Sequence, residues 1–119
     1  MATERTIELV VNVTTTNTWT QLLEQGGAAY AVPADGSVDI RWLAITNYGA
    51  NLATVEIAFS PTDTITDDER VLAPIPLTQY ESLRDPDGHA LPPTYAVWAR
   101  AVGTTPNVTY RAYILETTP

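Results

Sequence analysis

The stretch Val108-Thr109-Tyr110-Arg111-Ala112-Tyr113-Ile114 decides the fold, because its residues alternate between two kinds. Its even-numbered positions are Val, Tyr, Ala and Ile, and its odd-numbered positions are Thr, Arg and Tyr. An alternation with period two places one set on a buried face and the other toward solvent, as in a half-buried β-strand. The β-branched and aromatic residue types also suit a pleated surface. The stretch therefore predicts a strand of a sandwich or barrel.

The same alternation recurs at Ile7–Val13 and at Ala53–Phe59, and turn clusters such as Pro33–Gly36 and Gly103–Asn107 separate the runs. This spacing predicts an all-β chain, folded as a single antiparallel β-sandwich of eight or nine short strands. We expect one domain over residues 1–119, with short polar tails at 1–6 and 117–119. The expected strands are 6–14, 18–23, 28–32, 37–47, 52–60, 69–73, 77–83, 94–102 and 107–116.

Three segments fit the strand pattern less simply. The best helical candidate, Trp19–Gln25, is too short to stand without support. The segment 61–76 is the longest irregular stretch, and we expect it to connect strands over one end or edge of the sandwich. Trp42 lies in the otherwise apolar series Val38, Ile40, Ala44, which favours a place in the core.

The composition excludes several classes of protein. The chain has 119 residues, a formal net charge of −8, no Cys and six basic residues that are all Arg. Without Cys, neither a disulfide framework nor a cysteine zinc site can form. The acidic balance opposes binding to nucleic acid or to an anionic membrane. No apolar run approaches the roughly 20 residues of a membrane span, and the first six residues do not resemble a signal peptide, so we expect no Sec export.

An acidic cluster is the first candidate for a binding site. Asp63, Asp67, Asp68 and Glu69 lie close together in the sequence, and Ca²⁺ prefers oxygen ligands. Their spacing does not match an EF-hand loop, and no Gly stands at the required bend. We favour a solvated acidic loop and keep the calcium loop as the alternative.

The sequence around the single histidine does not indicate a catalytic or metal-binding site. His89 follows Asp85-Pro86-Asp87-Gly88, a sequence typical of a turn. One His without Cys offers no metal constellation, and no triad with a credible nucleophile is visible. We therefore expect no catalytic residue, no cofactor and no enzymatic activity.

The aromatic residues leave two alternatives. Trp98 and Arg100 alternate on one strand, and Trp, Tyr and Arg are enriched at interface hot spots. We therefore name Trp98, Arg100 and Tyr113 as a possible subunit interface. The alternative is an aromatic platform that binds carbohydrate.

The order of these features resembles small β-sandwich virion proteins of tailed bacteriophages. In those proteins a Tyr-x-Val-Pro-Ala-Gly corner opens a long strand that ends in Asn, as Tyr30–Asn47 does here. A second corner, Ala90–Ala99, opens the last hairpin. The likeness runs from about residue 7 to residue 116. The chain departs from the pattern at the first corner, which reads Ala34-Asp35-Gly36, and at the second, which has Pro92-Pro93 where Gly is usual.

The resemblance implies a jelly-roll-like structural subunit of a virion or of a phage-derived particle. Its expected role is capsid decoration or cementing, and the alternative is a small tail, neck, head-spike or fibre-base subunit. The expected partners are the major capsid protein, other virion proteins and further copies of the chain, with a trimer favoured. The expected location is the virion, assembled in the host cytoplasm. Such proteins have no catalytic residues to carry over.

Overall fold

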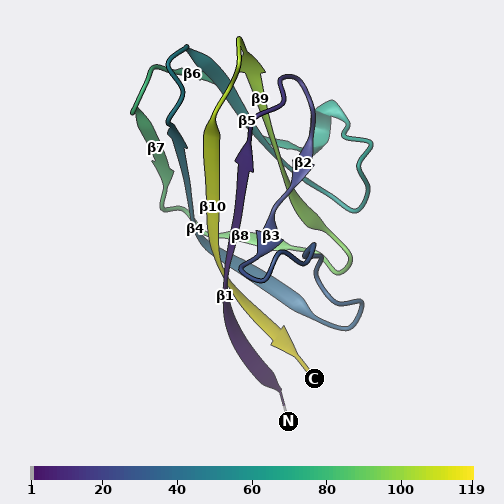
Figure 1. Ribbon diagram of the computed structural model, residues 1–119. Coiled ribbons are helices and arrows are strands. Elements are labelled where there is room, and N and C mark those ends of the chain that lie inside the picture. Colours follow the sequence, from purple (N-terminus) through teal and green to yellow (C-terminus); the bar gives the residue numbers. More distant parts are fainter. Residues whose placement is uncertain (1) are drawn as a thin grey trace.

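Two antiparallel β-sheets pack face to face in the computed structural model, which describes residues 2–119 except for the side chain of Ala73 (Figure 1). Within this range no helix is long and apolar enough to cross a membrane. The elements are β1 (Thr3–Val13), β2 (Thr20–Gln21), β3 (Leu23–Glu24), β4 (Ser37–Asn47), β5 (Ala53–Ser60), the 3-10 helix η1 (Asp67–Glu69), β6 (Arg70–Leu77), β7 (Ser82–Asp85), β8 (His89–Leu91), β9 (Ala96–Gly103) and β10 (Val108–Thr118).

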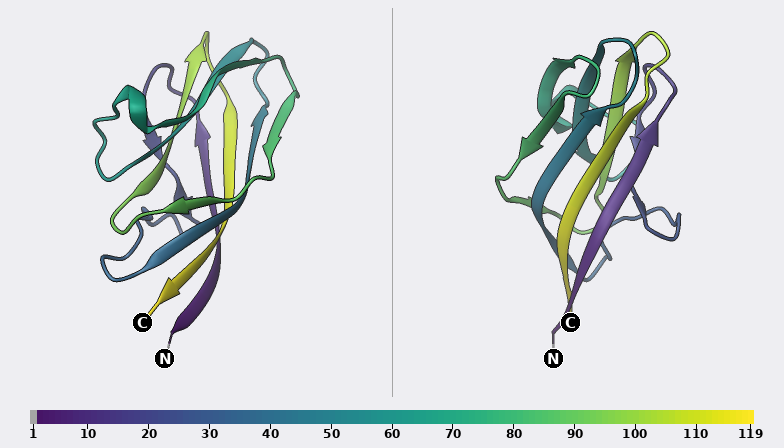
Figure 2. Two further views of the ribbon diagram at one scale, coloured as in Figure 1. Left: turned by 180° about the vertical axis from the view of Figure 1, so that it is seen from behind. Right: turned by 60° about the vertical axis from the view of Figure 1, so that its left-hand side comes forward.

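The strand order is that of a jelly roll. One sheet has the order β3-β1-β10-β4-β7, with β8 also pairing β4, and the other has the order β2-β9-β5-β6. The first and last long strands, β1 and β10, pair over their whole length from Thr3↔Thr118 to Val13↔Val108, so both termini lie at one end (Figure 2). The predicted antiparallel, jelly-roll-like sandwich is confirmed, and β3 and β8 are short additions to its eight main strands.

The core fills the space between the two sheets. Tyr110 is completely buried there, and its hydroxyl donates a 2.6 Å hydrogen bond to the carbonyl of Arg100. Burying each large apolar side chain contributes about 1.5–3 kcal/mol before chain entropy is counted. The largest fully buried side chains are Leu9, Leu22, Ile40, Leu43, Ile45, Ile57, Tyr110, Ile114, Val38, Val55, Val97 and Val108.

A β-bulge in β4 overturns the prediction that Trp42 lies in the core. Tyr113 of β10 pairs with Trp42, but the next residue, Ile114, pairs with Ile40, so Arg41 is the extra residue. A bulge of this kind reverses the alternation beyond it. Val38 and Ile40 face the core before the bulge, whereas Leu43, Ile45 and Asn47 do so after it. Trp42 therefore lies on the outer face of the six-stranded sheet.

The structure differs from the expected element limits at several other places, and the strand expected at 77–83 is β7, at Ser82–Asp85. The segments expected as polar tails are part of the sheet from Thr3 and up to Thr118, because β1 and β10 pair there. The helical candidate Trp19–Gln25 instead forms β2 and β3. Residues 28–32 contribute only the isolated bridge Leu23↔Ala29. Residues 74–76, expected as part of a connection, continue the strand expected at 69–73 as β6.

Candidate functional site

A polar cluster covers the outer face of the four-stranded sheet. Glu56 of β5 is 2% exposed, and its carboxylate accepts hydrogen bonds from Arg100 of β9 and, at 3.4 Å, from Arg70 of β6. The Arg100 guanidinium lies 4.6 Å from the ring centre of Trp19, within the range of a cation–π contact. Trp98 beside it donates its ring N–H to the carbonyl of Ser60 at 3.1 Å. Trp98 and Arg100 are thus engaged within the chain.

Tyr113 lies on the opposite outer face. Its ring stacks on Trp42, with ring centres 5.8 Å apart and planes within 5°. The guanidinium of Arg84 lies 5.7 Å from the centre of the Trp42 ring. Because the strand order is β10-β4-β7, Tyr113 approaches Trp42 from one side and Arg84 from the other. The structure therefore separates Tyr113 from Trp98 and Arg100, with which it was grouped as a possible interface.

The acidic cluster forms its own hydrogen bonds. Asp67, Asp68 and Glu69 make up η1, and the Glu69 carboxylate accepts the backbone N–H of Thr66 at 2.9 Å. This bond holds the pKa of Glu69 below its usual value. The carboxylate of Asp67 lies 3.4 Å from Arg70. Over residues 2–119, no group of three or more His, Cys, Asp or Glu residues is arranged to hold a metal ion.

His89 bonds to the turn that precedes it. Its Nε2 lies 2.9 Å from the carboxylate of Asp85, and its ring forms a T-shaped contact with the ring of Phe59. The hydrogen bond from His89, together with that from the backbone N–H of Asp87, holds the pKa of Asp85 below its usual value. These residues adjoin a pocket of about 440 Å³ lined by Asp39, Ile40, Arg41, Pro86, Gly88, His89 and Ala90.

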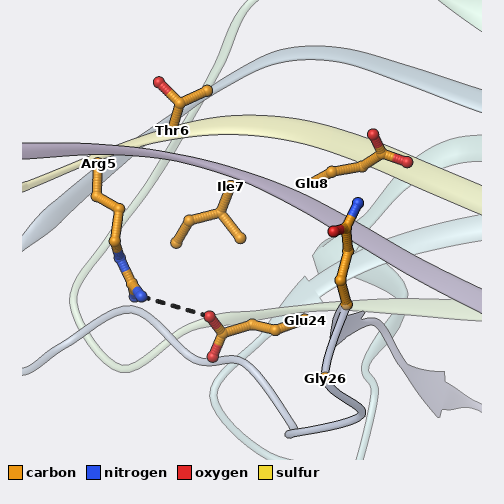
Figure 3. Close-up of a pocket in the computed structure, with 7 residues that line it drawn as sticks. Arg5, Thr6, Ile7, Glu8, Glu24 and Gly26 are labelled. Atoms are coloured by element: carbon orange, nitrogen blue, oxygen red, sulfur yellow. Dashed lines mark hydrogen bonds and ion pairs between the residues drawn. The ribbon is translucent and has the colours of Figure 1, made fainter.

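A second pocket, of about 270 Å³, lies between β1 and the turn after β3 (Figure 3). Arg5 reaches across it to Glu24 at 3.5 Å and also binds Glu116 at 3.3 Å. Two carboxylates thus hold the guanidinium within the chain. The volume is also below the roughly 300–1,000 Å³ of typical small-molecule sites.

The end of the sandwich opposite the termini is built from four loops, which we call the loop end: residues 14–19, 48–52, 78–81 and 104–107 (Figure 1). Asn47 is fully buried beneath it. Its side-chain amide donates to the carbonyls of Asn51 and Leu77, each at 2.9 Å, and its side-chain oxygen accepts the N–H of Gly49.

Further bonds join the remaining loops. Asn51 donates to the carbonyl of Thr104 at 3.0 Å, and the N–H of Gly103 donates to the hydroxyl of Thr16 at 3.1 Å. The loop end is therefore a hydrogen-bonded platform. We did not identify it from the sequence. The signal that would have shown it is a lack of charge in the four sequence stretches that cross this end.

Comparisons with known proteins add evidence on the fold. The sequence matches no family model and no curated protein. The structure is similar over its whole length to a chain of the acidic stable capsid structure of Helicobacter pylori bacteriophage KHP30, with a TM-score of 0.59, 13% identity and coverage of 94% of that chain. It is also similar to a Bacillus endospore appendage, described as a disulfide-linked pilus, with a TM-score of 0.50, 18% identity and coverage of 99% of this chain and 89% of that one. The resemblance to small β-sandwich phage virion proteins is confirmed at the level of the fold.

Proposed function

We propose that the chain is a non-catalytic structural subunit of a virion, and specifically a capsid decoration or cement protein. The observation that carries this proposal is the likeness to the phage capsid chain, which spans all of this chain and 94% of the other. The proposed partners are the major capsid protein and further copies of the chain, with a trimer favoured. The proposed location is the assembled particle.

The test is the copy number of the chain in purified particles, measured by quantitative mass spectrometry after a high-salt wash that removes loosely bound protein. A decoration protein is expected at a copy number comparable with that of the major capsid protein. The control is a mock preparation from cells that produce no particles. Absence of the chain from washed particles would contradict any virion role.

A tail, neck, head-spike or fibre-base subunit is the second candidate. The likeness to an appendage pilus favours it, because that structure places the same fold in a fibre. In the same experiment, this role predicts only a few copies per particle. A carbohydrate-binding module has less support, because Tyr113 and Arg84 occupy the two sides of Trp42, while Trp19 carries Arg100 on its ring.

A further inference from the structure

Charge is distributed unevenly between the two ends of the sandwich. The stretches Leu9–Leu23, Trp42–Val55, Val71–Tyr80 and Ala101–Tyr110 contain no charged residue, although the chain carries 14 acidic and six basic residues. Each stretch includes all or most of one of the four loops of the loop end. The one charged residue in these loops is Glu81, and its carboxylate accepts the N–H of Thr78 at 2.9 Å. The loop end is thus a surface with a single carboxylate on an otherwise strongly acidic protein.

Exposed apolar side chains gather at this same end. Tyr80 is 70% exposed and Leu52 is 53% exposed, and Tyr48 and Val102 are also exposed. Single apolar side chains on a surface need no explanation, but a group of them on one end that carries little charge is typical of an interaction surface. The hydrogen bonds that join the loops lower the entropy lost when a partner binds.

The backbone of Tyr80 supplies an independent observation. Its φ is +63°, a left-handed conformation that is uncommon for a bulky residue. Glycine adopts this conformation without strain. Strained non-glycine residues persist where the surrounding structure fixes them, and they cluster at binding sites. Here the backbone N–H of Tyr80 is held by the carbonyl of Asn47 at 2.6 Å.

We propose that the loop end is the surface through which copies of this chain bind one another. A second copy also carries a charge of −8, so contact through an acidic surface brings like charges together. The molecule is 48 Å long, and contact through the loop ends keeps the acidic terminal parts of two copies well beyond the roughly 10 Å Debye length at 0.1 M salt. The loop end therefore offers a second copy less electrostatic repulsion than the acidic terminal parts do.

The size of the loop end sets the strength of this contact. The body measures 26 by 25 Å across, so an end-on contact covers on the order of 500 Å² per copy, less than the roughly 800 Å² per partner of a standard interface. We therefore expect weak association of free copies, with dissociation constants in the micromolar range or above. Many such contacts in one assembly reinforce each other.

Sedimentation equilibrium of the full chain at 20 mM and 500 mM NaCl tests the proposal. We expect reversible association that becomes at least threefold tighter at high salt, because at 20 mM NaCl the Debye length is roughly 20 Å and part of the repulsion between the acidic copies remains, whereas 500 mM NaCl screens it. Leu52→Asp and Tyr80→Asp should each weaken association at least tenfold. Ala34→Asp adds the same charge in an exposed loop outside the loop end, and should change the dissociation constant less than twofold.

A further variant separates binding from folding. Tyr80→Gly relieves the left-handed strain, so it should raise the melting temperature while it weakens association. The proposal is overturned if the wild type stays monomeric at millimolar concentration, if salt weakens association, or if Ala34→Asp acts as strongly as the loop-end variants. The loop-end contact rests on the self-association put forward under the proposed function, but it is tested on the isolated chain. Its failure therefore leaves the particle experiment unaffected.

Discussion

Asn47 shows how one residue organises the end of the sandwich. It is fully buried, and its side chain bonds to Asn51, Leu77 and Gly49 at 2.9 Å each. Asn47→Ala leaves these backbone groups without partners, and each buried unsatisfied group costs about 1–3 kcal/mol. We expect a loss of about 3 kcal/mol in the free energy of unfolding, measured by urea denaturation. Asn51→Ala removes one exposed hydrogen bond and should cost less than about 1 kcal/mol; equal losses in the two variants would contradict this account.

The environment of Tyr30 determines how the stability of the fold changes at high pH. Its side chain is buried, and its hydroxyl donates to the carboxylate of Glu116. Burial, together with this bond, raises the pKa of Tyr30 well above its ordinary value of 10.0. Above pH 10 the unfolded chain therefore loses the phenol proton while the folded chain keeps it, so stability falls as the pH rises.

Tyr30→Phe removes this contribution. We expect a loss of about 2 kcal/mol at pH 7, the usual worth of a hydrogen bond to a charged group. Between pH 9 and pH 11, the stability of the variant should fall less steeply than that of the wild type. Urea unfolding at successive pH values measures both effects. Tyr80→Phe, at an exposed tyrosine, is the matched control and should keep the wild-type slope. The account fails if Tyr30→Phe and the wild type have the same slope.

Among the elements, the long central strands were predictable from the sequence, whereas the full extent of the edge strand β6 was not. The predicted strands 37–47 and 52–60 match β4 and β5 within a residue. In contrast, we expected residues 74–76 to be irregular, because Pro74 and Pro76 cannot donate to a ladder. They lie in β6, at the edge of the four-stranded sheet, where missing donors are tolerated.

The bulge at Arg41 explains why the surroundings of Tyr113 were not predictable from the sequence. The alternation before Arg41 placed Trp42 in the core, and nothing in the local sequence marks the extra residue. The stack of Trp42 on Tyr113 depends on that shift. Similarly, Glu56 points outward as its alternation predicts, yet it is buried, because Trp19, Arg70 and Arg100 cover it from distant segments. Alternation predicts the face of a strand but not what covers that face.

Deletion of Arg41 tests the bulge directly. Without the extra residue, Ile40 and Trp42 become consecutive and pair with Ile114 and Tyr113 in an unbroken ladder, while Leu43 and Ile45 keep facing the core. We therefore expect the deletion variant to remain folded by circular dichroism at 25 °C. Arg41→Ala keeps the residue count and should change the free energy of unfolding by less than about 0.5 kcal/mol, as is usual for an exposed position. An unfolded deletion variant would show that Arg41 is not simply an extra residue in the ladder.

At the scale of the whole molecule, the first and last long strands of the chain pair with each other. β1 and β10 pair along their length although they lie at opposite ends of the sequence, and Thr3 pairs with Thr118. A jelly roll therefore has many contacts between distant residues, and folding slows as the mean sequence separation of contacts rises. The adjacent termini allow this cost to be tested without changing the core.

A circular permutant joins the termini through a short Gly-Asn turn and opens the chain between Asp63 and Thr64, in an exposed loop. β10 and β1 then become a local hairpin, which lowers the mean sequence separation of contacts. We expect the permutant to fold, because chain ends that lie close together and exposed loops tolerate such changes. Stopped-flow refolding in urea should give a folding rate at least threefold higher than that of the wild type. A linear chain carrying the same Gly-Asn extension after Pro119 is the control and should fold at the wild-type rate. An equal or slower rate for the permutant would mean that closure of β1 on β10 does not limit folding.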